Sequence, residues 1–184
     1  MHKLLRQLNQ DHNNLELLLN LLTKQLDEFH EGREHDMDLL AELVEYVASY
    51  EDQVHHPTED LLFERLKLRT EEKRVAVETL EDQHQLLTDM TKRFAQSLEG
   101  MLYGEVLLRR EVEAQGRAMV KVLRQHMELE EGEVFPLIDS RLQEEDWAFV
   151  EERAVKIRDP LFVEPDRARF INVFKHLSTE LGLS

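Results

Sequence analysis

The sequence predicts an all-α protein that folds as an antiparallel up-down-up-down four-helix bundle, with one or two extra helices at its C-terminal end. Four long segments place apolar residues three and four positions apart, which is the spacing of one face of an α-helix. The connections between these segments are short, as they are between antiparallel neighbours in a bundle. No segment shows the alternating pattern of a β-strand.

The first two helices are expected over residues 3–29 and from about residue 36 to residue 66. The apolar face of the first consists of leucines and one histidine, at Leu5, Leu8, His12, Leu15, Leu19, Leu22 and Leu26. The second helix contains Pro57, which removes a backbone donor and should bend it. The apolar pattern resumes beyond the proline, so we expect one bent helix.

The third helix is expected over residues 70–102 and the fourth over residues 105–140. Each carries one histidine on its apolar face, and Pro136 should distort the last turns of the fourth. Shorter helices are expected over residues 144–157 and 166–181. We therefore expect a bundle domain over residues 1–140, and a helical extension over residues 141–184 that packs on it.

Composition and charge exclude several classes of protein. The net charge of −16 repels nucleic-acid phosphates and anionic lipid headgroups, so we expect neither nucleic acid nor a membrane as a partner. The chain has no cysteine, which excludes disulfides, thiolate metal sites and cysteine catalysis. The sequence shows no apolar run that would span a bilayer and no signal-peptide pattern, so we expect a cytoplasmic protein.

Histidines and glutamates on the apolar faces predict a metal centre. His55 precedes Glu59 by four residues, and His126 precedes Glu130 by four, so each pair shares one face of its helix. A lone histidine in an apolar stripe is more often an ordinary core residue, but a carboxylate there is costly unless it is paired or bound to metal. The candidate metal ligands are His12, His55, Glu59, His84, His126 and Glu130.

The number of donor atoms predicts a reactive metal centre with an open coordination position, rather than a structural site in which protein ligands fill every position. If both glutamates bridge, each of two metal ions receives two imidazoles and two carboxylate oxygens. A solvent-derived bridge would add a fifth donor and leave one position open for a small molecule. Imidazole with carboxylate suits iron, and manganese or zinc are possible substitutes that these donors do not exclude.

Two segments resemble the signature segments of the hemerythrin-like HHE cation-binding family. They are residues 55–63 (HHPTEDLLF) and 126–136 (HMELEEGEVFP), and the Asp-His at 11–12 and DQHQ at 82–85 lie where that family places its other histidines. The resemblance covers about residues 1–140. It implies a non-haem centre of two iron ions with an oxo or hydroxo bridge, four terminal histidine ligands, and Glu59 and Glu130 as bridging ligands.

The sequence also departs from the oxygen-carrying hemerythrins. Those proteins have a second histidine in the third helix, four positions from the first, where this chain has Leu80 and Thr88 around His84. The resemblance is therefore to the broader HHE group. Further ligands remain open at His35, His56 and Glu51, although a solvated or supporting role is the simpler interpretation of each.

A ferritin-like centre is less well supported by the sequence. Such sites use Glu-x-x-His from two helices, and this chain has only one true copy, Glu81 with His84. Three aromatic residues, Phe63, Phe94 and Phe135, are expected near the metals, most simply as ordinary core.

The leading functional hypothesis is reversible binding or sensing of a small diatomic ligand, oxygen or nitric oxide. One alternative is a di-iron enzyme that reduces nitric oxide or peroxide, or repairs iron centres. Another is an iron-responsive interaction protein whose metal content controls a partner. The oligomeric state is open, with a homodimer as one candidate. The sequence shows no nucleophile arrangement and no phosphate-binding loop that would indicate a hydrolase or a nucleotide-binding protein.

Overall fold

The structure, a computed structural model, describes residues 1–32 and 36–180 and contains only helices, turns and irregular segments there. The all-α prediction is confirmed. The elements are α1 (Lys3–His30), α2 (Met37–Tyr46), η1 (Val47–His55), α3 (His56–Arg69), α4 (Arg74–Leu102), α5 (Arg109–Leu129), η2 (Glu130–Val134), α6 (Phe135–Arg141), α7 (Glu144–Arg153) and α8 (Ile171–Glu180).

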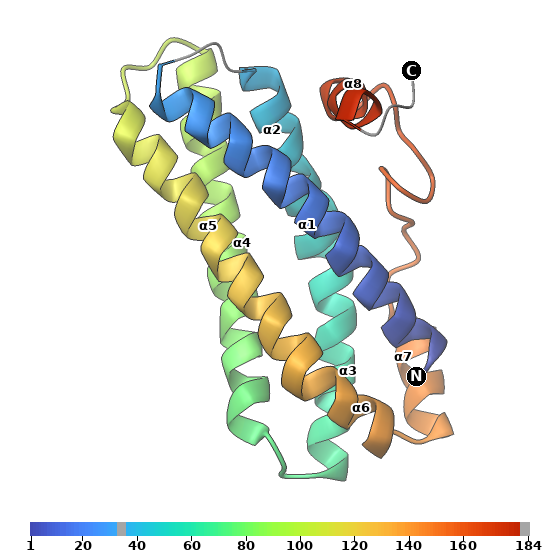
Figure 1. The fold of residues 1–184 in the computed structure, drawn as a ribbon. Coiled ribbons are helices and arrows are strands. Elements are labelled where there is room, and N and C mark those ends of the chain that lie inside the picture. The colour runs from blue at the N-terminus through green and yellow to red at the C-terminus, as the bar shows by residue number, and fades with distance from the viewer. Residues whose placement is uncertain (33–35, 181–184) are drawn as a thin grey trace.

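The long helices lie side by side (Figure 1). One column is α1 and a second is α4, while α2, η1 and α3 join end to end into a third and α5, η2 and α6 into a fourth. The fourth helix was expected to begin at residue 105 but begins at Arg109. The third begins at Arg74 rather than residue 70, because Lys73 adopts a left-handed conformation with φ 57°.

Each composite column contains a π-helical segment whose last residue lies two positions before a proline. In η1 the pattern ends with the N–H of His56 bonded to the carbonyl of Glu51, and Pro57 follows. In η2 the N–H of Phe135 bonds to the carbonyl of Glu130, and Pro136 follows. A proline cannot donate to the helix ladder, and wider turns of this kind often occur at functional sites. The bend expected at Pro57 therefore takes the form of a widened helix.

The apolar core is divided into two clusters, with the polar residues between them. On α1 the lower cluster contains Leu8 and the upper one begins at Leu15, with His12 between. On α4, Leu80 belongs to the lower cluster and Leu87 to the upper one, with a buried histidine between. Packed apolar side chains therefore lie above and below the candidate site.

The C-terminal helices pack on the column formed by α2, η1 and α3. Asp146 of α7 forms ion pairs with Arg65 and Arg69 of α3, and the backbone of α8 donates hydrogen bonds from Asn172 and Val173 to Glu42 of α2. Both helices are shorter than expected. Helix α7 ends at Arg153, and α8 begins at Ile171.

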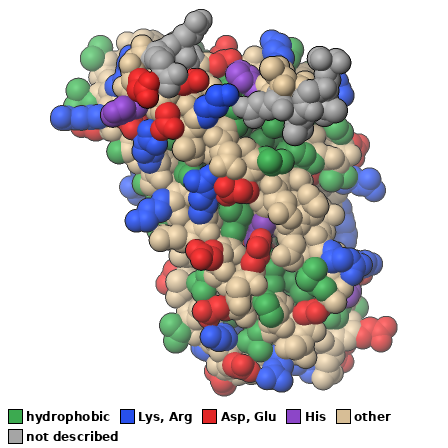
Figure 2. All heavy atoms as spheres, in the orientation of Figure 1, with side chains coloured by type: hydrophobic (Ala, Val, Ile, Leu, Met, Phe, Trp, Pro, Cys, Tyr) green, Lys and Arg blue, Asp and Glu red, His purple; other side chains and the backbone are tan. Residues whose placement is uncertain are grey.

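On the face drawn in Figure 2, acidic and basic side chains are interspersed and form no large patch of one charge. Within the described residues, none of the helices combines the length and the apolarity that a membrane span requires.

Candidate metal centre

Four buried imidazoles from four helical columns meet in pairs. His12 of α1 and His55 of η1 bring their Nε2 atoms to 3.0 Å, and those of His84 (α4) and His126 (α5) lie 3.1 Å apart. All four side chains are buried, with at most 6% of the residue surface exposed. The structure thus brings the four predicted histidines together with their Nε2 atoms pointing inward.

The outer nitrogen of each ring lies near an oxygen. The Nδ1 atoms are 2.8 Å from Glu131 for His12, 2.7 Å from Asp60 for His84, 3.1 Å from Gln83 for His126 and 3.4 Å from Asp11 for His55. An oxygen in this position accepts a hydrogen bond from the Nδ1–H and leaves the Nε2 lone pair free. This is how proteins usually orient a histidine that binds a metal.

Glu59 lies between the two histidine pairs. One oxygen, Oε1, is 3.0 Å from His55 Nε2 and 3.6 Å from His12 Nε2, while the other, Oε2, is 3.5 Å from His84 Nε2. The side chain is fully buried, and neither oxygen accepts a well-formed hydrogen bond from the part of the chain that the structure describes.

Glu130 occupies the matching position on the fourth column. Its Oε2 lies 3.4 Å from His12 Nε2 and its Oε1 lies 3.3 Å from His126 Nε2. This side chain is also fully buried, with no hydrogen-bond partner for either oxygen among the described residues. An unpaired buried carboxylate is costly, and a cation on each side would satisfy both oxygens of each glutamate.

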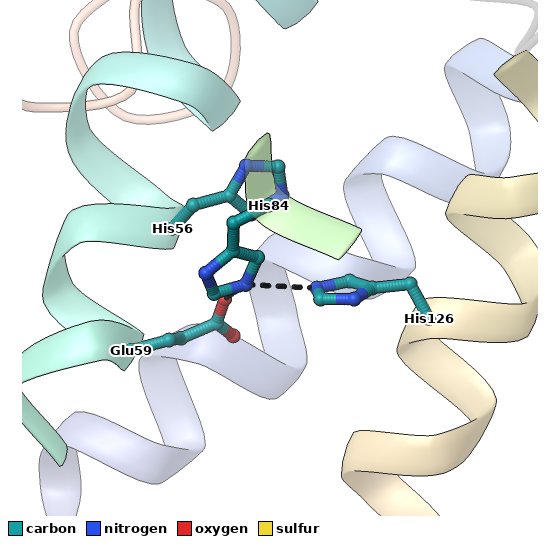
Figure 3. A group of neighbouring side chains, drawn as sticks. All are labelled: His56, Glu59, His84 and His126. Atoms are coloured by element: carbon teal, nitrogen blue, oxygen red, sulfur yellow. Dashed lines mark hydrogen bonds and ion pairs between the residues drawn. The ribbon is translucent and has the colours of Figure 1, made fainter. Parts of the chain in front are cut away.

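The side chains form two groups that could each hold a metal ion. Three residues, His12, His55 and Glu59, have ligand atoms within 4.8 Å of one another. The second group again includes Glu59, together with three histidines: His56, His84 and His126 (Figure 3). Glu59 is therefore common to both groups, as a ligand that bridges two metal ions would be.

Residues 3–138 match the family model described as the hemerythrin HHE cation binding domain. The chain belongs to this family. No curated protein and no solved structure matches it. In this HHE domain the buried histidines and Glu59 fit a pair of cations, because their donor atoms converge. Glu130 belongs to neither group of donor atoms, but its oxygens, like those of Glu59, have no hydrogen-bond partner among the described residues.

Protons balance the charge of the HHE cluster when no metal is bound. Burial opposes a charge on His12, but Glu131 and Glu59 outweigh it and raise the pKa of His12 to about 9. Burial likewise opposes a charge on His84, whose pKa Asp60 and Glu59 raise to about 9. Burial lowers the pKa of His126 to about 3. Metal ions would replace the protons held by the first two rings.

The two glutamates differ in their tendency to ionise. Burial raises the pKa of Glu130 to about 8, and the charge of Glu59 adds to this effect. Burial also opposes ionisation of Glu59, but the positive charge of His55 and the neighbouring histidines hold its pKa well below the usual range. A cation within the cluster would favour the ionised form of both.

His56 is the residue whose placement the sequence did not favour. It was expected to be solvated or supporting, because a regular helix turns about 100° per residue away from His55. It is buried, with 3% of its surface exposed, and lies in the second group. The adjacent Pro57 was the one signal in the sequence that indicated an irregular helix there.

Of the remaining candidates, one lies beside the site, one lies on the outside of the bundle and one falls outside the described residues. Glu51 is buried, with no hydrogen-bond partner for either oxygen in the described chain, and faces His55 Nδ1 at 3.9 Å. His35 falls outside the described residues. Glu81 forms an ion pair with Lys67 on the outside of the bundle, so the ferritin-like pattern receives no support from its position.

Two of the three aromatic residues stack on the site histidines. The ring of Phe135 lies 5.5 Å from that of His12, and the ring of Phe63 lies 5.8 Å from that of His84. Phe94 belongs to the upper core cluster. Rings at these positions restrict the motion of the two imidazoles and shield them from water.

Proposed function

We propose that this HHE protein is a non-haem di-iron protein that binds or senses a small diatomic ligand, oxygen or nitric oxide. The observation that carries the proposal is the position of the two buried glutamates. Glu59 and Glu130 each direct one oxygen toward His12, in the first histidine pair, and the other toward the second pair. This arrangement supports bridging of two metal ions by both side chains.

The donor set supports an exchangeable position at the centre. Two imidazoles and two carboxylate oxygens for each metal ion leave room for solvent and for one small ligand. Iron bound there would supply direct ligation of the diatomic molecule together with electron transfer to it. The same donors accept manganese and zinc, so the choice of iron rests on the proposed chemistry.

The protein's own contribution is to hold the rings and to exclude water. Oxygens of Glu131, Asp60, Gln83 and Asp11 fix the orientation of the four imidazoles. The apolar clusters above and below keep the site dry, which strengthens electrostatic interactions within it. We infer that the four helical columns follow the up-down-up-down order expected of such a bundle.

The proposal is tested by metal content and reversible spectral change. Protein from iron-supplemented cells should contain about two irons per chain, since two donor groups are present. Admitting oxygen or nitric oxide to the reduced protein should produce an absorption band that disappears when the gas is removed. A matched control is His30→Gln, which removes an imidazole whose side chain is 65% exposed and paired with Glu113.

Other outcomes of this experiment separate the alternatives. Sustained consumption of peroxide or nitric oxide would favour the enzymatic hypothesis over binding. Two irons with no response to either gas, together with a partner captured only by the iron-bound form, would favour an iron-responsive interaction protein. Absence of metal, with stability unchanged by iron, manganese or zinc, would overturn the metal centre itself.

A further inference from the structure

His56 and His55 are adjacent in sequence, yet both side chains enter the core. They are 3% and 2% exposed, and their ring centroids lie 5.9 Å apart with planes at 75°. The π-helical segment η1 ends between them, and its wider turn reduces the rotation from one residue to the next. The local backbone therefore presents two successive imidazoles to the same site.

The contacts of His56 place it with the second histidine pair. Its ring stacks on that of His84, with centroids 4.5 Å apart and planes at 16°, and meets that of His126 edge-on at 5.3 Å. Figure 3 draws these three rings together with Glu59, and in this view the ring of His84 lies between that of His56 and the carboxylate. A nitrogen of His56 lies within 4.8 Å of the donor atoms of these other three residues.

The surroundings of His56 resemble those of the other site histidines. Its Nδ1 is 3.4 Å from an oxygen of Asp52, whose side chain is only 5% exposed. Neither atom has a hydrogen-bond partner among the described residues, so the pair is close but not engaged. Each of the other four rings likewise has a carboxylate or amide oxygen next to its Nδ1.

We propose that His56 is a fifth imidazole ligand of the metal ion held by His84 and His126, which it binds through a ring nitrogen when its ring turns out of the stack with His84. This inference rests on the proposed di-iron function. The helix of His84 offers no second imidazole, since Leu80 and Thr88 occupy the positions one turn away. His56 reaches the same place from the neighbouring column.

The assignment makes the two metal positions unequal. Three imidazoles, two carboxylate oxygens and a solvent bridge supply six donors to the metal of His56, His84 and His126. The metal of His12 and His55 receives five by the same count.

The test uses full-length protein titrated with cobalt(II), a paramagnetic ion that accepts imidazole and carboxylate ligands. Ligated histidines give strongly shifted, solvent-exchangeable N–H signals in the proton NMR spectrum. The wild-type protein should show five, and His56→Gln should show four. The variant should also bind its second cobalt more than about 100-fold more weakly, since losing a supporting group alone costs about 10–100-fold.

A second variant keeps the test decisive if His56→Gln folds poorly. Asp52→Asn leaves the imidazole in place and should weaken the second site about 10–100-fold while all five signals remain. Two cobalt ions bound with four signals in the wild-type protein, and wild-type affinity in His56→Gln, would overturn the assignment and leave the di-metal centre intact. A wild-type protein that binds fewer than two ions would overturn both proposals.

Discussion

His84 and His126 bring their Nε2 atoms to 3.1 Å while the Nδ1 of each ring lies beside an oxygen, of Asp60 and Gln83 respectively. If both Nδ1 atoms donate to these oxygens, the two Nε2 lone pairs face each other. Such a contact is stable only if a proton or another cation lies at it. The metal-free protein therefore needs protons where the proposed centre has metal ions.

We predict that metal binding releases protons and becomes tighter as pH rises to about 9. His12 and His84, with pKa values of about 9, are protonated at pH 7 in the metal-free protein. Each proton displaced makes the apparent affinity rise about tenfold per pH unit. Zinc titration calorimetry in two buffers of different ionisation enthalpy measures the release. A binding heat that is independent of the buffer would contradict the prediction.

The metal-free protein should also lose stability at alkaline pH. A histidine pKa raised from 6.5 to about 9 stabilises the folded state fully below about pH 6.5, and this contribution is lost as pH rises through about 9. The melting temperature should fall by about 2–4 °C for each kcal/mol lost. The metal-bound protein serves as the control, because its imidazoles do not bind protons over this range.

Glu59→Gln should impair both metal positions, since Glu59 belongs to both groups of donor atoms. An amide is a weaker ligand and bears no charge, so we expect less than about one metal ion per chain under conditions that saturate the wild-type protein. Metal analysis after gel filtration gives the ratio. Glu128→Gln is the matched control, because Glu128 is exposed two residues from Glu130. Retention of two ions by Glu59→Gln would exclude a bridging role.

The sequence predicted the parts of this site that depend on regular helical spacing. His12 and His84 lie in leucine-rich stripes, and Glu59 and Glu130 follow histidines by four residues, so one face of each helix carries them inward. Spacing alone identifies residues that share a face. It does not give the distances between columns, which come from packing of the two core clusters.

His56 could not be assigned from spacing because the helix around it is irregular. Pro57 signals a disturbed ladder, but a kink and a π-helical turn are both compatible with it. The choice between them determines whether His56 points outward or inward. The bounds of α4 and α5 were missed for a related reason, since the turn at Lys73 and the segment before Arg109 depend on local backbone conformation.

We predict that the ion pairs of Asp146 hold α7 against α3, and that they are lost when Asp146 is protonated at acid pH. Burial opposes the charge of Asp146, but Arg69 and Arg65, with the backbone of Gln143, lower its pKa to about 2. A lowered carboxyl pKa stabilises the fold above about pH 3.8, and this contribution is lost as pH falls through about 2. Asp146→Asn should therefore lower the free energy of unfolding by about 1–2 kcal/mol at pH 7.

Trp147 directly follows Asp146 and is the only tryptophan of the chain, so its fluorescence reports on the contact between α7 and α3. Its fluorescence should shift to longer wavelength in Asp146→Asn at pH 7, and in the wild-type protein only near pH 2. Glu145→Gln is the control, because Glu145 pairs with Arg69 at the surface and should contribute less than about 0.5 kcal/mol. An unchanged spectrum and stability in Asp146→Asn would show that the other contacts of α7, such as the ion pair of Glu151 with Lys3, hold it without Asp146.

Glu51→Gln should stabilise the metal-free protein without reducing its metal capacity. Burial raises the pKa of Glu51 to about 8, so the folded state holds its proton more tightly than the unfolded state, and ionisation becomes a growing cost as pH rises from about 4.5 to about 8. Glutamine keeps the shape and removes the charge. The gain should be on the order of 3 kcal/mol at pH 9 and smaller at pH 6, as measured by denaturant unfolding.

The control variant is Glu45→Gln. Glu45 forms an exposed ion pair with Arg169, so this change should alter stability by less than about 0.5 kcal/mol. Loss of one metal ion per chain in Glu51→Gln would instead show that this carboxylate supports the metal site through His55, whose Nδ1 lies 3.9 Å from a Glu51 oxygen.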